Sequence, residues 1–321
     1  MEIIQKTTDF QLNSATAVAM GKFDGVHIGH RRLLEEILAQ KSRGLKTCVF
    51  TFDPAPAVLF GLSDGRELST CGEKHRLFAD MGVDILIEFP LDRETAATPA
   101  ERFVREYLCG KMNAKYIAAG EDLSFGAKGA GDAGLLRAMG EALGFEVQII
   151  EKVCVDGREV SSSRIRECVE NGDMETAGKL LGSPYTVSGT VVQGNQIGRT
   201  IGFPTVNLQP ESGKILPPNG VYYSRVLWKG QEFAAISNVG CKPTVTDERV
   251  MGVESFLYDF DRELYGQDIS VELLSFRRAE QHFENLEALQ VQLKEDIAEG
   301  RRYHGIGSSV QKHMVNSRKE S

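Results

Sequence analysis

The sequence lacks the long apolar run of a membrane-spanning helix, because no stretch reaches the ~20 apolar residues needed. Residues 1–10 mix charged and apolar side chains, so we expect neither a signal peptide nor a transit peptide. The cysteines are scattered without a CxxC pair: Cys48, Cys71, Cys109, Cys154, Cys168 and Cys241. Such cysteines are typical of reduced thiols that mostly fill a core. The sequence therefore predicts a cytoplasmic protein without a membrane partner.

The sequence also has fewer positive than negative side chains, so its formal net charge is −8. This balance argues against a general nucleic-acid binder, so any phosphate contacts should be local. No GxxxxGK[ST] motif occurs, which excludes a P-loop. The length of 321 residues exceeds the roughly 250–300 at which a single core stops growing, so two domains are expected.

The first half of the chain alternates short apolar runs with amphipathic stretches. The runs that predict strands are 16–20, 46–52, 84–89, 115–120 and 145–150, and those that predict helices are 30–40, 73–82, 99–110 and 134–144. This alternation indicates an α/β fold with a parallel, Rossmann-like sheet, whose ligands bind at the carboxyl ends of the strands. A hairpin around Asp156-Gly157 and two short helices, 164–171 and 174–182, should follow.

The pattern changes after Pro184, where β-rich segments are separated by Gly, Pro and Asp turns. These segments predict a small closed antiparallel β-barrel with a hairpin tip at Lys229-Gly230. Residues 284–300 have apolar side chains at helical spacing and predict a C-terminal helix that covers the barrel. We therefore expect a first domain over 1–183, a second over 184–308 and a disordered tail over 309–321.

The segment GKFDGVHIGH, residues 21–30, follows the first predicted strand and enters a helix near Gly29. His27 and His30 are three residues apart, so they lie on one side of the helix N-terminus. Free backbone N–H groups and two imidazoles suit a phosphate, and Gly21 and Gly25 let the backbone approach it closely. The expected chemistry is in-line attack on the α-phosphorus of ATP with pyrophosphate leaving. An isolated histidine pair of this spacing is more often a polar helix start or a fortuitous metal pair, but HxGH after the first strand of a parallel sheet is much more specific for phosphate.

Two later segments could complete this first site. A Gly-rich loop after the predicted strand at 115–120 carries Asp122, and its alternative interpretation is a flexible connection. The segment SSSRIRE begins a predicted helix with three hydroxyls and two guanidinium groups: Ser161, Ser162, Ser163, Arg164 and Arg166. Hydroxyls and guanidinium forks at a helix N-terminus suit a triphosphate, although one serine is expected to act as the N-cap.

The β-rich half has its own candidate cluster. Thr205 and Asn207 are two residues apart on an extended chain, so their oxygens face one side and could bind Mg²⁺ together with nucleotide phosphates. Glu254, in an apolar strand, could be the general base that a phosphoryl acceptor alcohol needs. The alternatives are an ordinary turn and a carboxylate facing solvent. Arg278 is either a surface charge or a substrate-positioning group.

Eight segments in this order resemble the bifunctional bacterial riboflavin kinase/FAD synthetase family over about residues 10–305. They are GKFDGVHIGH, GEDLSFG, SSSRIR, GRTIGFPTVN, NGVY, NVGCKPT, VESF and DRELYG. The resemblance implies an N-terminal adenylyltransferase that joins FMN and ATP into FAD and pyrophosphate. It also implies a C-terminal kinase that phosphorylates the terminal ribityl hydroxyl of riboflavin. Mg²⁺ is the implied cofactor, and riboflavin, FMN and ATP are the implied small-molecule partners; a weak homo-oligomer is compatible with the sequence.

The resemblance also implies roles for individual residues. In the adenylyltransferase, His27 and His30 would be catalytic, and the nucleotide-binding or FMN-binding residues would be Gly21, Phe23, Asp24, Gly25, Asp122, Ser161, Ser162, Ser163, Arg164 and Arg166. In the kinase, Glu254 would take the hydroxyl proton and Thr205 and Asn207 would bind Mg²⁺. The remaining binding residues there would be Gly189, Gly198, Arg199, Gly202, Pro204 and Arg278.

Four positions depart from the family's usual pattern: Ala55, Leu123, Ser163 and Val206. Most lie in the implied adenylyltransferase site, so they bear on its rate or flavin affinity. Two alternatives therefore stay open, a riboflavin kinase with weak or lost adenylyltransferase activity and a non-catalytic flavin-binding regulator.

Overall fold

The computed structural model describes residues 1–194, 202–243 and 249–307. The chain divides into two compact units. The first contains Met1–Cys168, Thr176–Ser183 and Ser212–Ile215, and the second contains Val169–Glu175, Pro184–Glu211 and the described residues from Leu216 onward. Each unit therefore includes a short segment from the other side of residue 183, so a single cut of the chain does not separate them.

The first unit is built on a six-stranded parallel sheet with the order β1-β4-β3-β2-β5-β6. Its strands are β1 (Glu2–Gln5), β2 (Thr16–Met20), β3 (Lys46–Asp53), β4 (Ile85–Pro90), β5 (Ala114–Gly120) and β6 (Glu146–Ile150). The predicted parallel sheet is thus confirmed. β1 was not predicted, because it is a short and largely exposed edge strand without a continuous apolar run.

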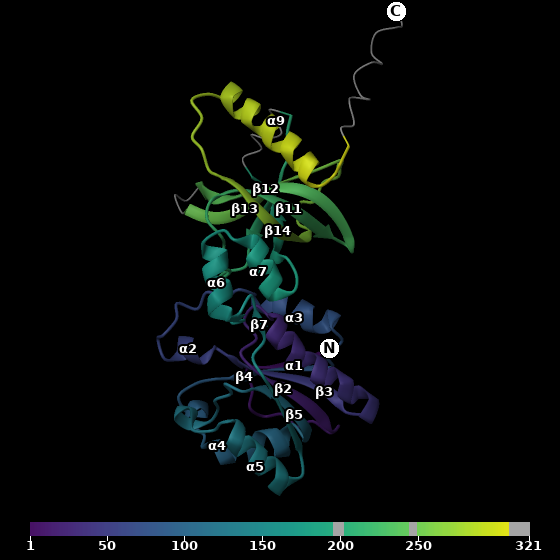
Figure 1. Ribbon diagram of the computed structural model, residues 1–321, viewed down its shortest axis with the longest axis vertical. Coiled ribbons are helices and arrows are strands. Elements are labelled where there is room, and N and C mark those ends of the chain that lie inside the picture. Colours follow the sequence, from purple (N-terminus) through teal and green to yellow (C-terminus); the bar gives the residue numbers. More distant parts are fainter. Residues whose placement is uncertain (195–201, 244–248, 308–321) are drawn as a thin grey trace, which may run out of the picture. The chain divides into compact units, whose positions relative to one another are not determined.

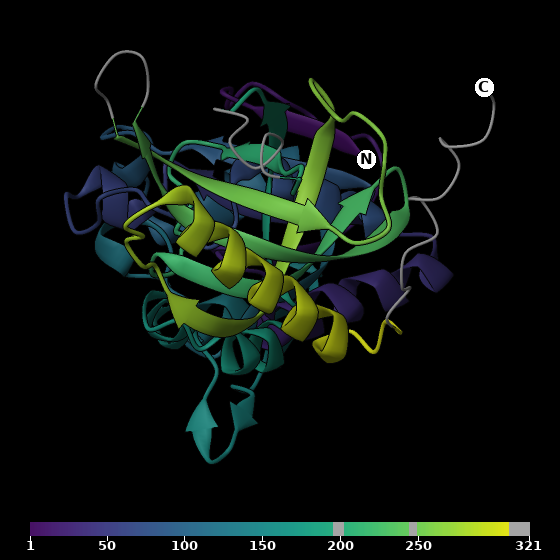
Figure 2. The same cartoon turned by 90° about the horizontal axis from the view of Figure 1, so that it is seen from above.

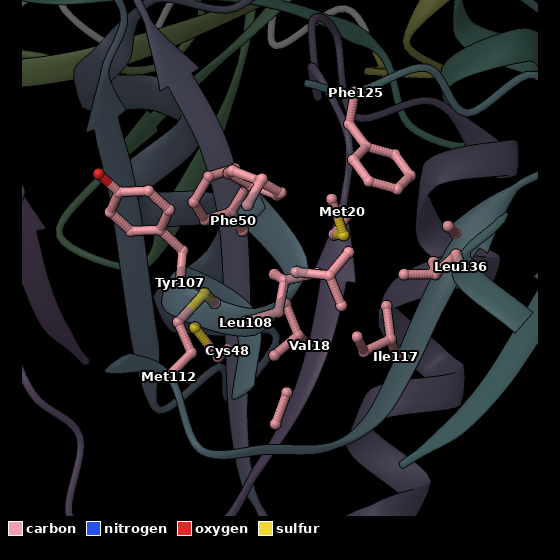
Figure 3. Close-up of a cluster of buried hydrophobic side chains, with 14 of the residues drawn as sticks. Val18, Met20, Cys48, Phe50, Tyr107, Leu108, Met112, Ile117, Phe125 and Leu136 are labelled. Carbon is pink, nitrogen blue, oxygen red and sulfur yellow. The ribbon is translucent and has the colours of Figure 1, made fainter. Parts of the chain in front are cut away.

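Helices cover both faces of this sheet (Figure 1). One face carries α1 (Ile28–Ala39) and α3 (Cys71–Asp80), and the other carries α5 (Ala133–Leu143) and α4 (Ala100–Phe103), which continues into the π-helical segment η3 (Val104–Lys111). Because successive strand residues point to opposite faces, the two faces have separate cores. Figure 3 shows the core under η3 and α5, where Val18, Phe50 and Ile117 of the sheet meet Leu108 and Leu136.

The strand order creates a switch point between β2 and β5. The chain leaves β2 toward β3 on one side and leaves β5 toward β6 on the other side. In open parallel sheets a crevice forms at such a point, outside the carboxyl ends of the strands. The segments that follow β2 and β5 contain the first candidate cluster, so the topology brings residues 21–30 and Asp122 to the same crevice.

A short hairpin and a helix pair follow β6, and Val169–Glu175, where the two helices meet, belong to the second unit. The hairpin joins β7 (Cys154–Val155) and β8 (Arg158–Glu159) through Asp156 and Gly157, which both have positive φ, as expected for a two-residue turn. The helices are α6 (Ser162–Glu170) and α7 (Met174–Leu181). The predicted hairpin and the two short helices are therefore present. A further short helix, α2 (Pro56–Leu59), follows β3.

The second unit is a closed barrel with the strand order β10-β13-β12-β11-β14-β9, in which every neighbouring pair is antiparallel. Its strands are β9 (Tyr185–Val192), β10 (Val206–Pro210), β11 (Gly220–Trp228), β12 (Gln231–Pro243), β13 (Arg249–Leu257) and β14 (Asp268–Ala279). The predicted barrel is confirmed, and Lys229 and Gly230 form the tip between β11 and β12. β10 was expected only as the end of a loop, because its few residues are of mixed polarity.

Helix α9 (Leu286–Tyr303) lies across the barrel strands (Figure 2). Ile297 packs in a small core with Tyr258, and the Tyr258 hydroxyl donates to the Ile297 carbonyl oxygen at 2.9 Å. Leu286, the first apolar residue of the predicted stripe, is 57% exposed, whereas Asp296 is buried. The helix therefore covers the barrel as predicted, partly through a buried carboxylate. The predicted disordered tail, 309–321, lies outside the described residues.

Two findings bear on the cellular setting expected from the sequence. Within the three described ranges, no helix is both long enough and apolar enough to cross a membrane. The expectation that the cysteines mostly fill the core is wrong, because Cys71 and Cys154 are exposed and Cys109 and Cys168 are only half-buried. Cys48 is buried. Apolar character alone does not place a cysteine, since the face of the element on which it lies decides its exposure.

Candidate active sites

The loop that joins β2 to α1 is held in an unusual backbone conformation. Phe23, Gly25 and Val26 all have positive φ, which is rare for a β-branched residue such as valine. The Phe23 and Val26 side chains are fully buried in the core under α1. A Cβ on Gly25 would lie only 3.0 Å from Leu68 Cδ1, so this position needs glycine. Packing on both sides therefore stabilises a strained loop that leads directly into His27.

His27 and His30 form the centre of the first candidate site. His27 is the N-cap of α1, and its Nδ1 accepts a hydrogen bond from the His30 backbone N–H at 3.3 Å. The two rings are stacked, with centroids 3.7 Å apart and planes inclined by 13°. Since Nδ1 of His27 is an acceptor, a neutral His27 ring carries its proton on Nε2. His27 can therefore donate from Nε2 to an oxygen of a ligand.

Burial keeps both imidazoles neutral at pH 7. It lowers the pKa of His27 from 6.5 to about 4, while the nearby carboxylates of Asp24 and Asp122 oppose the shift. The pKa of His30 lies well below its ordinary value because of burial and the neighbouring His27 ring. An anionic phosphate would stabilise the charged imidazolium forms, so its arrival should raise both pKa values. The pair is thus a donor that can respond to negative charge.

Asp24 ties the loop to two other segments of the first unit. Its carboxylate accepts from the Leu68 N–H and from Arg166 Nη2, both at 2.7 Å, and its carbonyl oxygen accepts from the Ser162 hydroxyl at 2.9 Å. Ser161 accepts from the Arg164 N–H at 3.3 Å and so provides the expected N-cap of α6. Asp24, Ser162 and Arg166 therefore hold the site together, whatever else they contact when substrate binds.

A cavity of about 390 Å³ opens between the ends of β2 and β5. Its walls bring together several of the predicted residues: Gly21, His27, His30, Asp122, Ser161, Ser162 and Ser163. Arg164 does not line it, because its Nη1 donates to the carbonyl oxygens of Val155 and Arg158 in the β7–β8 hairpin. Lys22 and Lys152 line the cavity and were not predicted as site residues. Lys22 lies inside the motif at 21–30, so only its adjacency to the glycines could have indicated it.

A second cavity, of about 280 Å³, shares four wall residues with the first: Phe52, Pro56, Ser124 and Phe125. Its other walls are largely apolar and include Phe60, Phe89, Leu91 and Phe103. The polar cavity at the histidine pair therefore adjoins an aromatic one. Of the family departures, Leu123 and Ser163 line the polar cavity, while Ala55 is the N-cap of α2.

The barrel brings the predicted base, Glu254, together with the predicted Mg²⁺ ligands, Thr205 and Asn207. The Thr205 hydroxyl donates a hydrogen bond to Oε1 of Glu254. Asn207 on β10 lies directly opposite Glu254 on β13 in the strand register. A Cβ on Gly194 would lie 2.5 Å from Asn207 Nδ2, so glycine there leaves room for the amide. Strand pairing therefore gathers a hydroxyl, an amide and a carboxylate.

Thr205 and Asn207 also line a cavity of about 440 Å³ in the barrel, together with Pro204 and Val206. Val206 is one of the four positions that depart from the family pattern. The far wall of the cavity comes from the segment after β13, namely Phe260, Asp261, Arg262, Glu263, Leu264 and Tyr265. No site role was predicted for this segment, although DRELYG was among the motifs that carry the family resemblance. The charged residues of that motif are the signal that could have indicated it.

The other predicted kinase residues have different surroundings. Arg278 does not line the cavity; its Nη2 donates to Asp296 of α9 at 2.6 Å. A Cβ on Gly189 would lie 2.1 Å from the Gln209 carbonyl oxygen, so that glycine permits the close approach of β9 and β10. Gly202 has a positive φ of 87°. Gly198 and Arg199 lie outside the described residues.

Comparison with known proteins assigns the two halves separately. A family model described as FAD synthetase matches residues 9–164, and one described as riboflavin kinase matches residues 181–304. A bifunctional riboflavin kinase/FMN adenylyltransferase of Escherichia coli is 36% identical over 90% of this chain and 93% of its own length. The protein of the same description from Listeria monocytogenes is 34% identical over 92% of this chain and 95% of its own length.

A solved structure agrees with the fold but has a different description. It is described as a macrolide-efflux protein from Streptococcus pneumoniae, is 31% identical, and superposes with a TM-score of 0.83 over 94% of this chain and 99% of its own. That description names a transport activity that neither family model nor the two relatives above share. The identity to those relatives and the match of both halves carry the assignment: the chain belongs to the bifunctional riboflavin kinase/FMN adenylyltransferase family.

Proposed function

We propose that the protein makes FAD from riboflavin in two ATP-dependent steps at two sites. Residues 184–308 would phosphorylate riboflavin to FMN, and residues 1–183 would adenylylate FMN. The observation that carries the proposal is that each unit has its own cavity lined by a polyphosphate-handling cluster, His27 and His30 in one and Thr205 and Asn207 in the other. The family assignment supplies the substrates. A cytoplasmic location remains a prediction of the sequence.

In the adenylyltransferase step, a phosphate oxygen of FMN attacks the α-phosphorus of ATP, and the bond from that phosphorus to the α,β-bridging oxygen breaks to release pyrophosphate. Catalysis of this kind depends on positioning and charge stabilisation. His27 donates from Nε2, and the N-terminus of α1 provides free N–H groups and the positive end of the helix dipole. Lys22, at the cavity wall, supplies positive charge for the leaving pyrophosphate, whereas Lys152 lines the same wall but is paired with Glu159 at 2.9 Å.

The aromatic cavity fits the flavin half of the substrate. FMN joins a flat, largely apolar ring system to a phosphate, and the two adjoining cavities offer the same sequence of surfaces. Rings such as Phe89 and Phe103 can pack against the isoalloxazine, while the phosphate extends toward the histidine pair. Leu123, one of the departures from the family pattern, lines the polar cavity. Its side chain is therefore placed to affect how tightly the ribityl chain of FMN is held.

In the kinase step, the terminal ribityl hydroxyl oxygen attacks the γ-phosphorus of ATP and ADP leaves. Glu254 accepts the proton that this hydroxyl loses. The donor set of Thr205 and Asn207 suits Mg²⁺, because it consists of few, neutral, hard oxygens that leave positions for water and phosphate. When bound, the ion neutralises phosphate charge. Thr205 also donates to Glu254, which orients the carboxylate.

The test is a flavin product assay run separately with riboflavin and with FMN as the starting substrate, each with ATP and Mg²⁺. The proposal expects FMN and then FAD from riboflavin, and FAD from FMN. Accumulation of FMN without FAD would favour a kinase whose N-terminal site has lost activity. Flavin binding without any phosphate transfer would favour a non-catalytic regulator.

A further inference from the structure

A cluster of three potential metal ligands lies outside both cavities described above. Cys71 and His75 are one turn apart on α3, so their side chains share one face of the helix. Glu88 reaches the same point from β4 and is 5% exposed. Cys71 Sγ, His75 Nε2 and a Glu88 carboxylate oxygen all lie within 4.8 Å of one another. Among the described residues, this is the group of three or more His, Cys, Asp and Glu side chains that could hold an ion.

The three contacts have the spacing of a coordination sphere. The Cys71 Sγ to His75 Nε2 distance is 3.2 Å, Cys71 Sγ to Glu88 Oε1 is 3.4 Å, and His75 Nε2 to Glu88 Oε1 is 3.0 Å. Tetrahedral Zn²⁺ with bonds of ~2.0–2.3 Å separates one thiolate and two nitrogen or oxygen ligand atoms by ~3.3–3.6 Å. Each ligand atom needs to move outward by only a few tenths of an ångström for all three to surround one ion.

The geometry argues against a nucleophilic triad. A triad needs the histidine to contact the thiol through one ring nitrogen and the carboxylate through the other. Here the same atom, Nε2 of His75, faces both Cys71 and Glu88. Burial and the Glu88 carboxylate also raise the pKa of the Cys71 thiol to about 12, the opposite of an activated thiolate. Convergence on one nitrogen suits a shared ion instead.

The local charge favours a cation. Glu88 and, farther away, Asp53 place negative charge near the thiol. The ammonium group of Lys74 opposes this charge at the thiol, but its Nζ lies 3.2 Å from the carboxylate of Glu67 and is thus already paired. A divalent cation that displaces the thiol proton to solvent would neutralise this environment. Thiolate and imidazole ligands prefer a borderline-soft ion, whereas Mg²⁺ prefers oxygen ligands.

We propose that Cys71, His75 and Glu88 form a binding site for a Zn²⁺-type divalent cation, with water in the fourth position. The exposure of Cys71 gives the ion an entry path and a solvent-facing position. Glu88 and Phe89 are consecutive on β4 and point to opposite faces of the sheet, so the ion lies on the α3 face and the aromatic cavity on the other. The site links the start of α3 to β4 and is independent of the proposed catalytic roles.

The test uses the full-length protein, titrated with Co²⁺ in excess Mg²⁺ and then with Zn²⁺. We expect one equivalent of Co²⁺ to produce thiolate-to-cobalt charge-transfer absorption, and Zn²⁺ to abolish it by displacement. Cys71→Ser should remove the band, and His75→Asn should weaken Co²⁺ binding at least tenfold, because losing even an outer-shell partner typically costs about 10–100-fold. The matched control is Cys154→Ser, which removes another exposed thiol and should leave the band unchanged.

A second readout identifies the cysteine directly. Zn²⁺ should protect Cys71 from alkylation, as followed by mass spectrometry of the peptides, while Cys154 stays reactive. Circular dichroism of each variant verifies that it is folded. The proposal is overturned if no charge-transfer band forms, if the band survives in Cys71→Ser, if it is lost in Cys154→Ser, or if Zn²⁺ leaves the alkylation of Cys71 unchanged.

Discussion

The two candidate sites are both suited to a polyphosphate, but the backbone contributes differently to each. At the first, α1 begins with N–H groups that have no partner within the helix, so the backbone itself can contribute to phosphate binding. At the second, Asn207 and Glu254 lie on paired strands, whose N–H groups are largely used by the barrel's hydrogen-bond ladder. A β-barrel site therefore depends more on side chains and a cation. The comparison predicts that the two sites fail in different ways.

The largest effect should come from removing the base of the barrel site. We expect Glu254→Gln to lower the rate of riboflavin phosphorylation by about 10²–10⁴-fold, the usual contribution of general-base catalysis. FAD formation from supplied FMN should stay unchanged. Both rates can be followed by chromatography of the flavins. Equal losses in the two reactions, in a folded variant, would contradict the separation of the sites.

The matching change in the first unit should have the opposite selectivity. We expect His27→Ala to lower FAD formation from FMN by about 10²–10³-fold, because it removes a preorganised donor, and to spare riboflavin phosphorylation. His282→Ala serves as the control, since this histidine is exposed in the second unit. The comparison breaks down if His27→Ala slows the kinase reaction as strongly as it slows the adenylyltransferase.

Acid should weaken the first unit through His27. Its folded pKa of about 4 lies below the ordinary 6.5, so between these values the unfolded state binds more protons than the folded state. The free energy of unfolding should therefore fall as the pH drops from about 6.5 toward 4, by up to ~3 kcal/mol from this residue. This fall can be measured by denaturant titrations at several pH values, in which hydrogen exchange in β2 and α1 monitors the unfolding of the first unit.

The variant His27→Asn provides the control for this pH dependence, because it removes the contribution of His27 and leaves that of His30, whose pKa is also lowered. The single tryptophan, Trp228 on β11, reports separately on the barrel by fluorescence. A slope that is the same in His27→Asn would mean that other groups cause the acid sensitivity.

A smaller effect is expected from Asp24, which supports the loop between β2 and α1 and has no proposed part in the chemistry. Asp24→Asn keeps an acceptor for the Leu68 N–H but loses the charge that pairs with Arg166. We expect the free energy of unfolding to fall by about 1–3 kcal/mol, since a partly buried charged hydrogen bond is lost. FAD formation should fall more than riboflavin phosphorylation. Arg164→Gln, which alters the hairpin anchor instead, distinguishes loop support from general loss of stability in this unit.

Much of the architecture could be predicted because its signals are local. Period-two and helical patterns identified most strands and helices, and Asp156-Gly157 identified a hairpin. β1 and β10 were missed because both are short, and pairing with neighbouring strands rather than composition makes them strands. The site residues at 21–30 and 205–207 were recognisable because each group is contiguous in sequence.

Contacts between distant segments were beyond the sequence patterns. Arg164 and Arg166 are two residues apart and looked equivalent, yet one anchors a hairpin and the other pairs with Asp24. Arg278 looked like a substrate-positioning candidate, but α9 returns to the barrel and presents Asp296 to it. The cluster of Cys71, His75 and Glu88 also depends on β4 placing a carboxylate against α3.

The sequence by itself determined that a parallel α/β half precedes an all-β half, and that each carries a compact motif suited to phosphate. The tertiary structure alone decided which charged groups line the cavities and which pair with other segments instead. The physical reason is that periodicity and turn chemistry depend on neighbours along the chain, whereas burial, ion pairing and the pKa values of His27 and His30 depend on segments that only folding brings together.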